Sequence, residues 1–376
     1  MGFEDFLGNR PVVELLQSMM ARDRLPHALL LCGPAGVGKY TLAQMLAKAL
    51  HCLEKVNDFC GRCRNCRAIA LADDRRAAVE QAEEERERLT KRPREIPLVI
   101  QSHPDVVLLA PNGPLRLFQI EQARYLKEAL TYVPAGGRKK IFLLPDADRM
   151  DAAAANSLLK SLEEPPPHSM LVLTTTREAA LLPTIRSRCV PLWLGPLARQ
   201  QVVAFLEGAV PASRDEDERV LRAAVSQGCP GRALRLDLEH YLSVRDSLLT
   251  MVRAGLEARN FAELFAESQK LAREKEGLEN LLAVLYSLLQ DILHIEARAN
   301  GEPLRNADRP KTLFEVARSL GVEKLAEAAA TLGSMEKNLR RNVPAQISLE
   351  AFAISLAPVR RAAKSGLAGE APVVQA

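Results

Sequence analysis

The sequence predicts an α/β domain followed by two helical domains, and three observations lead to this architecture. A short apolar run leads into a glycine-rich turn and then into a helical pattern. Strand-like and helical segments alternate to about residue 195, which predicts a mostly parallel sheet flanked by helices. Beyond that point the pattern is helical. We therefore expect domains at 1–195, 196–240 and 241–363, followed by a disordered, frayed tail at 364–376.

Hydrophobic periodicity places the individual elements. Short apolar runs predict strands at 28–32, 106–110, 141–144 and 171–174. Amphipathic patterns predict the later helices at 198–208, 216–227, 241–258, 260–273, 277–299, 312–320, 322–340 and 347–360. The turn Gly228-Cys229-Pro230-Gly231 divides this helical region.

Composition excludes several classes of function. Lysine and arginine total 51 against 47 aspartates and glutamates, a net charge of +4 that argues against a wholesale nucleic-acid coat. An aromatic content of 4% argues against a protein that stacks single-stranded bases. No apolar run reaches about 18 residues, so no membrane-spanning helix is expected. The polar start does not resemble a secretory signal, and clustered cysteines are typical of a reducing compartment, so we expect a cytoplasmic protein.

The glycine-rich turn matches the phosphate-binding pattern G-x-x-x-x-G-K. Its glycines let backbone N–H groups converge on phosphate oxygens, and its lysine adds positive charge. A strand precedes the pattern and a helix follows it, which is the context in which it binds a nucleotide. The predicted cofactor-binding residues are Gly33, Gly36, Gly38, Lys39, Tyr40 and Thr41.

The same site lacks the residues that hold magnesium in an ATPase. The residue after Lys39 is normally Ser or Thr, but Tyr40 stands there, and Thr41 is rotated by about 100° along the helix. The second ligand should be an aspartate that ends a strand. Pro145 takes that place in one register and Asp146 in a register shifted by one. We predict no intrinsic ATP turnover and leave ATP binding open; the alternative is an active ATPase with an unusual metal shell.

Four cysteines within the segment 52–66 follow the pattern C-x7-C-x2-C-x2-C. Each C-x2-C step lets neighbouring thiolates bind one ion, and four thiolates complete a tetrahedral zinc shell. A closed shell leaves no position for water, so the expected zinc is structural. The predicted ligands are Cys52, Cys60, Cys63 and Cys66, and the alternative is four unrelated thiols.

The segment 73–95 is dense in acidic and basic residues. The pairs Glu84/Arg88 and Glu87/Lys91 have the i,i+4 spacing that stabilises a helix surface. We predict a solvated helical insertion, with partner binding as the alternative.

Several motifs occur in a recognisable order. They are Leu25-Pro26-His27, the phosphate loop, the four cysteines, His103-Pro104-Asp105, the run ANSLLKSLEEPP at 155–166, and Ser187-Arg188-Cys189. Together they resemble the clamp-loader subunits of bacterial DNA polymerase III, which are AAA+ proteins, and most of all the delta-prime branch of that family. The resemblance covers about 3–240 by motif and extends more loosely to 338–356.

The resemblance implies an AAA+ domain with an embedded zinc module, a lid domain and a helical collar. It implies a stator-like subunit that joins gamma/tau and delta subunits in a hetero-pentamer. That assembly opens a sliding clamp and places it on primed DNA. The polymerase (nucleotidyltransferase) chemistry is expected in another subunit of the holoenzyme. The alternative within the family is an ATP-hydrolysing motor subunit of the gamma/tau type.

The resemblance also implies a role for Arg188. In this family the arginine of the SRC motif reaches the ATP site of a neighbouring motor subunit. A guanidinium is always charged and binds phosphate oxygens in a fork, which makes it suited to act as a finger in trans. The alternative is a local salt bridge. Thr174, Thr175 and Thr176 could sense a γ-phosphate or simply end a strand. Gly231 stands where motor subunits carry a phosphate-contacting lid arginine.

Overall fold

The computed structural model describes residues 2–89, 96–113, 116–136, 138–209, 215–257, 261–273, 277–297, 304–338 and 343–357. The chain divides into two compact units, Met1–Arg235 and Leu236–Ala376, and each is described by itself. The predicted tail at 364–376 and the end of the predicted insertion, 90–95, lie outside the described residues.

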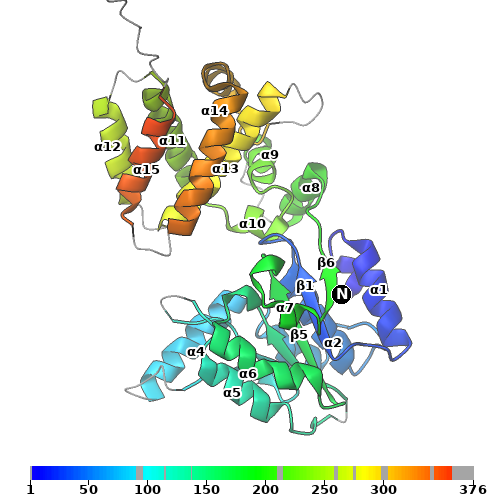
Figure 1. Ribbon diagram of the computed structural model, residues 1–376. Helices are drawn as coiled ribbons and strands as arrows, with labels where there is room; N and C mark the ends of the chain where they lie inside the picture. The colour runs from blue at the N-terminus through cyan, green and yellow to red at the C-terminus, as the bar shows by residue number, and fades with distance from the viewer. Residues whose placement is uncertain are drawn as a thin grey trace, which may run out of the picture. The chain divides into compact units, whose positions relative to one another are not determined.

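A six-stranded sheet forms the centre of the first unit, with the order β2-β3-β4-β5-β1-β6 (Figure 1). Its strands are β1 Ala28–Cys32, β2 Ile100–His103, β3 Val106–Leu108, β4 Lys140–Leu144, β5 Ser169–Thr175 and β6 Val190–Trp193. The pairing is parallel except between β2 and β3. The mostly parallel sheet is therefore confirmed.

Helices cover both faces of this sheet. The helices packed with the sheet are α1 Arg10–Ala21, α2 Lys39–His51, α3 Arg64–Ala70, α4 Arg75–Leu89, α5 Ile120–Ala129, α6 Ala152–Glu163 and α7 Pro183–Arg186. Three further helices follow the sheet in the chain and pack on one another around a small core of their own: α8 Arg199–Ala209, α9 Glu216–Val225 and α10 Pro230–Arg235. The side chains of β1 alternate between two cores, as the period of a strand requires. Leu29 and Leu31 pack with residues of α1 and α2, whereas Leu30 packs with residues of α5 and α6.

The four predicted strands are present, but β2 and β6 were not anticipated. Both lie at the edges of the sheet. In β6, Pro191 contributes no backbone N–H, and Val190 and Trp193 are exposed. An edge strand pairs on one side only, so it tolerates proline and polar residues and lacks the continuous apolar run that reveals a central strand.

Gly228 fixes the turn before α10. Its φ is +75°, and a Cβ there would lie 2.3 Å from the carbonyl oxygen of Leu197. We expect Gly228→Ala to lower the free energy of unfolding by about 2–4 kcal/mol, because it adds a backbone clash to a left-handed conformation. Urea unfolding followed by circular dichroism measures the change.

The matched control is Gly208→Ala, in the exposed part of α8, where a new Cβ meets nothing within 4 Å. This substitution should raise stability by about 0.5–1 kcal/mol, since alanine loses less backbone entropy in a helix than glycine. Equal effects of the two substitutions would contradict the strained turn at Gly228.

The second unit is helical throughout its described residues. Its helices are α11 Leu238–Glu257, α12 Phe261–Ala272, α13 Gly277–Glu296, α14 Pro310–Asn338 and α15 Ala345–Ser355. Helices α11, α12 and α15 pack together, and α13 packs along α14 (Figure 1). Gly321 interrupts α14 with a non-helical conformation, which confirms the predicted break between the helices at 312–320 and 322–340. Among the described residues, none of the helices has both the length and the apolar character needed to cross a bilayer.

Candidate nucleotide site and zinc centre

The glycine-rich turn connects the end of β1 to the first residue of α2, in the strand–loop–helix order that the motif requires. Gly33, Gly36 and Gly38 have φ angles of 146°, 81° and 104°. Residues with a Cβ rarely adopt these angles, so the three glycines give the loop its shape. The loop therefore has the backbone form of a phosphate cradle at a helix N-terminus.

Lys39 is folded back onto this loop. Its Nζ donates hydrogen bonds of 2.7 Å to the carbonyl oxygens of Gly33 and Pro34. Burial lowers the pKa of Lys39, and the carboxylate of Asp146 acts in the opposite direction. The ammonium group therefore rests on neutral acceptors that a charged phosphate would outcompete.

Tyr40 points away from the loop, toward the start of α4. Its hydroxyl donates to the Ala72 carbonyl at 2.5 Å and accepts from Gln44 at 2.6 Å. The tyrosine therefore anchors the insertion that begins after Ala72, and its oxygen is committed there. Thr41, the next residue, is exposed. Neither side chain supplies a hydroxyl to the place where an ATPase holds magnesium.

The loop after β4 carries the acidic residues of the site. Asp146 accepts an ion-paired hydrogen bond of 2.8 Å from Arg75 of α4, and its backbone N–H donates to the Thr174 hydroxyl at 3.2 Å. The Thr175 hydroxyl donates to Asp148 at 2.8 Å. The two buried threonines thus hold the acidic loop in place, a positioning contact that follows directly from their place at the end of β5.

Helix α10 closes over the phosphate loop from the other side. The Gly231 N–H donates to the Gly36 carbonyl at 2.9 Å. A Cβ at Gly36 would lie 2.6 Å from the backbone nitrogen of Arg232. Small residues on both sides permit this close approach. Gly231, the position predicted to lack a phosphate-contacting arginine, instead makes a backbone contact with the loop.

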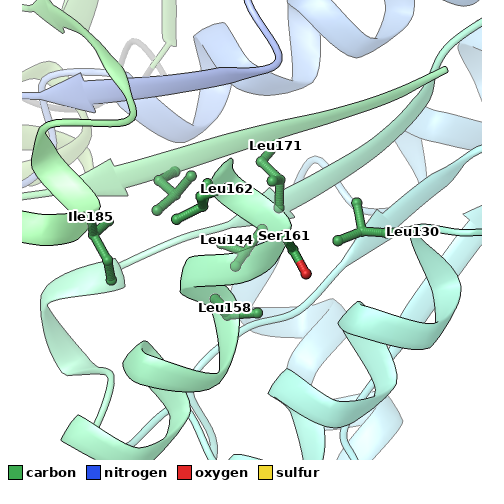
Figure 2. Close-up of a pocket in the computed structure, with 8 residues that line it drawn as sticks. Leu130, Leu144, Leu158, Ser161, Leu162, Leu171 and Ile185 are labelled. Atoms are coloured by element: carbon green, nitrogen blue, oxygen red, sulfur yellow. The ribbon is translucent and has the colours of Figure 1, made fainter. Parts of the chain in front are cut away.

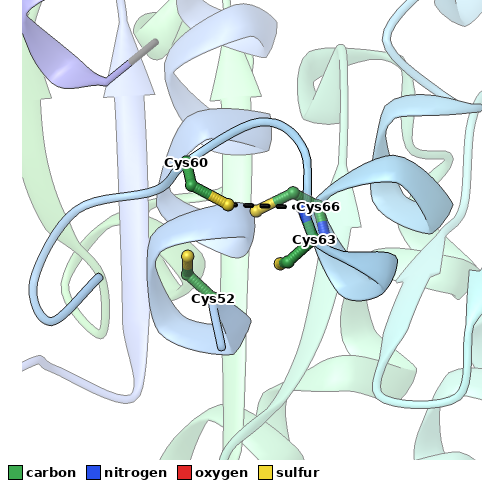
Figure 3. A group of neighbouring side chains, drawn as sticks. All are labelled: Cys52, Cys60, Cys63 and Cys66. Atoms are coloured by element: carbon green, nitrogen blue, oxygen red, sulfur yellow. Dashed lines mark hydrogen bonds between the residues drawn. The ribbon is translucent and has the colours of Figure 1, made fainter. Parts of the chain in front are cut away.

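The four predicted zinc ligands come together between α2 and α3 (Figure 3). Their sulfur atoms all lie within 4.8 Å of one another, and three of the four residues are buried. Zn–S bonds of about 2.3 Å place the sulfurs of a tetrahedral shell about 3.8 Å apart. The cluster therefore has the donor chemistry and the spacing to hold a zinc ion. The ligands are Cys52, Cys60, Cys63 and Cys66.

Backbone N–H groups point at these sulfurs. Cys60 accepts from the nitrogen of Cys63 at 3.3 Å, and Cys63 accepts from that of Cys66 at 3.5 Å (Figure 3). Burial alone would raise the pKa of Cys63, but hydrogen bonds from Leu53 and Cys66 bring it down to about 6. Burial raises the pKa of Cys66 to about 12. A bound cation would compensate the buried thiolates that this arrangement brings together.

A second group of metal-ligand residue types lies beside the cysteines. His51, His103 and Asp105 have ligand atoms within 4.8 Å of one another and are buried. Two of the three residues are engaged with the backbone: Asp105 accepts from the N–H groups of Ala135 at 2.7 Å and Gly136 at 2.9 Å, and His103 Nδ1 accepts from the backbone N–H of Asp105. We assign this group to the structure of the turn that enters β3.

Arg188 makes a local ion pair in the described chain. Its guanidinium donates to Glu163, the last residue of α6, at 2.5 Å, and to the Thr184 carbonyl at 2.9 Å. The two side chains are 31% and 48% exposed. A pair this exposed contributes about 0–1 kcal/mol, so another anion could displace Glu163 at little cost.

A small pocket lies under α6, between this helix and the sheet (Figure 2). Leucine and isoleucine side chains line it, and Ser161 adds one hydroxyl. Such an apolar space stays dry and supplies no set of converging polar groups. We assign it to core packing. The lining residues are Leu130, Leu144, Leu158, Ser161, Leu162, Leu171, Leu173 and Ile185.

The expectation of a simply solvated insertion is wrong for one face of α4. Arg86 is buried and donates to the Ile96 carbonyl at 3.2 Å, while Arg75 reaches Asp146. The pair Glu84/Arg88 is present at 3.7 Å on the exposed face, and Lys91 lies outside the described residues. Arg75 and Asp146 are 71 residues apart, so no spacing rule could have joined them.

Comparison with known proteins identifies the family to which this phosphate-loop protein belongs. A family model described as "DNA polymerase III, delta subunit" matches residues 8–198. The chain therefore belongs to this DNA polymerase III family.

Individual relatives agree with the family model. Subunit delta' of DNA polymerase III from Bacillus subtilis is 27% identical over 92% of this chain and 95% of its own length. The delta' subunit from Pseudomonas aeruginosa is 32% identical over 68% of this chain and 69% of its own length. Subunit tau of Bacillus subtilis is 24% identical over 77% of this chain and 46% of its own length. The chain is thus a homologue of the delta' subunits of the clamp-loader complex, with tau and gamma subunits as further relatives.

Proposed function

We propose that this chain is a stator of the clamp loader: a delta'-type subunit that organises neighbouring motor subunits and does not itself turn over ATP. The observation that carries the proposal is that the residues at the two metal-ligand positions are engaged with other groups of the chain. The Tyr40 hydroxyl is bonded to Ala72, and Asp146 is paired with Arg75. Hydrolysis of ATP depends on a bound metal for charge neutralisation, and these contacts engage the side chains at both metal-binding positions with other groups of the chain.

Arg188 is the group that this subunit would contribute to catalysis. We propose that it leaves Glu163 on assembly and contacts the γ-phosphate bound by an adjacent motor subunit. Its partial exposure and its weak ion pair support this role, because the head group can be released without unfolding α6. A planar guanidinium would stabilise the charge that develops on the transferred phosphoryl group.

The cysteine cluster would hold one structural zinc ion. Four sulfurs complete the shell, so zinc would have no open position for water and would take no part in catalysis. Its place in the fold supports a tethering role. Cys52 follows α2 directly and Cys63 caps α3, so one ion would join two helices that pack on the same core. Retention of zinc by free thiolates fits the reducing cytoplasm in which we place the protein.

The second unit would supply the contact to partner subunits. Helices α12 and α15 pack against each other, and large apolar side chains on both are substantially exposed. They are Phe261, Phe265, Ile347 and Ile354. Exposed apolar side chains grouped on neighbouring helices are typical of a protein interface. We propose that they contact gamma/tau or delta subunits in the hetero-pentamer. The assembled pentamer would then bind the sliding clamp and primed DNA.

The turnover of the isolated chain tests the stator against the motor. We expect the purified, zinc-loaded chain at saturating Mg-ATP to release no more phosphate than the Lys39→Ala variant, because the metal site is filled by the chain's own groups. A phosphate-release assay measures both under one set of conditions. Clear turnover that depends on Lys39 would contradict the stator and favour a gamma/tau-type motor.

A further inference from the structure

The charged insertion places one of its arginines between the two positions that bind magnesium in an ATPase. Tyr40 stands where the first ligand would be, and Asp146 stands on the loop that would supply the second. The Arg75 guanidinium lies 5.7 Å from the centre of the Tyr40 ring and 2.8 Å from the Asp146 carboxylate. The cation therefore contacts the side chains at both of the chain positions from which an ATPase draws its magnesium ligands.

Contacts made by the residues immediately before Arg75 fix this arginine in place. The Tyr40 hydroxyl and the Gln44 amide both bond to the Ala72 carbonyl. Lys48 of the same helix pairs with Asp73. These contacts hold the chain to α2 immediately before Arg75, the first residue of α4. The position of the guanidinium is thus a consequence of several contacts and not of one surface ion pair.

Arg75 also belongs to the electrostatic environment of the phosphate loop. After burial, the strongest influence on the pKa of Lys39 is the Asp146 carboxylate, and the charge of Arg75 lowers that pKa. The two cations and the Asp146 carboxylate therefore share one electrostatic environment. The Arg75 side chain is 34% exposed, so its remaining N–H donors can be reached from solvent.

We propose that Arg75 takes the place of the magnesium ion, so that this chain binds the polyphosphate of a nucleotide without a divalent metal. This inference rests on the proposed function only because both involve the same phosphate loop. Lys39 would exchange the Gly33 and Pro34 carbonyls for phosphate oxygens, and Arg75 would bind the polyphosphate from the α4 side. A guanidinium neutralises phosphate charge and forks onto its oxygens, but it cannot activate water as a metal does, so binding would occur without turnover.

Binding of ATP to the full-length, zinc-loaded chain tests the proposal. Isothermal titration calorimetry is run with metal-free ATP in buffer without magnesium, with no chelator so that zinc stays in place, and then with millimolar Mg²⁺. We expect ATP to bind without Mg²⁺ and to bind no more tightly when Mg²⁺ is added. Arg75→Ala should weaken the metal-free affinity by at least about tenfold, the loss expected for one charge-assisted contact.

Two further variants keep the result interpretable. Arg76→Ala removes the neighbouring arginine, which is exposed and pairs with Glu80 within α4, and it should leave ATP affinity unchanged. Asp146→Asn breaks the ion pair but keeps the Arg75 cation. If Arg75 only anchors the insertion, Asp146→Asn and Arg75→Ala should weaken binding alike. If Arg75 binds phosphate, Asp146→Asn should retain ATP binding, since it removes a competing carboxylate. Thermal unfolding of each variant shows that it is folded.

Three outcomes would overturn the inference: no binding of ATP by the wild-type chain, binding that requires Mg²⁺, or equal weakening by Arg75→Ala and Asp146→Asn. The first leaves the proposed stator intact, since a chain that binds no ATP also hydrolyses none. Lys39-dependent ATP turnover would instead contradict the proposed stator function. The two failures are therefore separable.

Discussion

A chain in which Cys66 is replaced by serine is expected to lose its zinc and about 3–5 kcal/mol of its free energy of unfolding. Cys66 is fully buried within the core that contains α1, α2 and α3. A hydroxyl is a poor ligand for a soft four-sulfur site, so the variant would lose the binding free energy that the zinc ion contributes to folding. Loss of a structural metal is among the few single changes that destabilise a protein this strongly. Zinc content by mass spectrometry and the thermal unfolding midpoint measure the effect.

Cys189→Ser provides the control for this prediction. Cys189 is also a buried free thiol, but it lies in the core on the opposite face of the sheet. The control should retain one equivalent of zinc and lose only the smaller energy of burying a hydroxyl, about 1–2 kcal/mol. The zinc site would be contradicted if the wild-type chain is purified without zinc. It would also be contradicted if the two variants lose equal stability and neither loses metal; the four cysteines would then be unrelated thiols.

Removal of the Arg188 side chain is expected to have the largest effect on the assembled clamp loader. In a complex reconstituted with its partner subunits, Arg188→Ala should reduce ATP turnover at the neighbouring site by about 10³-fold or more, as loss of an arginine finger does. The total ATP turnover of the complex should then fall to the rate that its other ATP sites supply. Steady-state phosphate release by the complex, with and without primed DNA, measures the change, and circular dichroism of the free subunit checks its fold.

Glu163→Gln separates this role from that of a local ion pair. The variant removes the partner of Arg188 but leaves the guanidinium itself. If the arginine only stabilises the end of α6, both substitutions should act alike and by less than about 1 kcal/mol. If it is a finger, only Arg188→Ala should lose turnover. Unchanged turnover in Arg188→Ala would exclude the assignment.

Elements that depend on local spacing could be predicted well. The apolar runs of β1 and β4 predicted central strands, and the periodicity around Gly321 predicted a break between two helices. By contrast, β2 and β6 escaped because an edge strand needs no continuous apolar run. The insertion was predicted as helical, but the inward direction of Arg75 and Arg86 was not, because a charged residue gives the same pattern whether it faces water or a partner within the protein.

The sequence by itself determined the phosphate loop, the cysteine cluster and the succession of strands and helices. Each depends on residues only a few positions apart, so backbone geometry and side-chain chemistry decide it locally. Only the tertiary structure decided that Arg75 meets Asp146, that Gly231 closes on Gly36, and that Glu163 holds Arg188. These residues come from elements far apart along the chain, and they meet because whole helices pack on one sheet. The spacing of residues within a sequence cannot encode such contacts, since their geometry depends on every element in between.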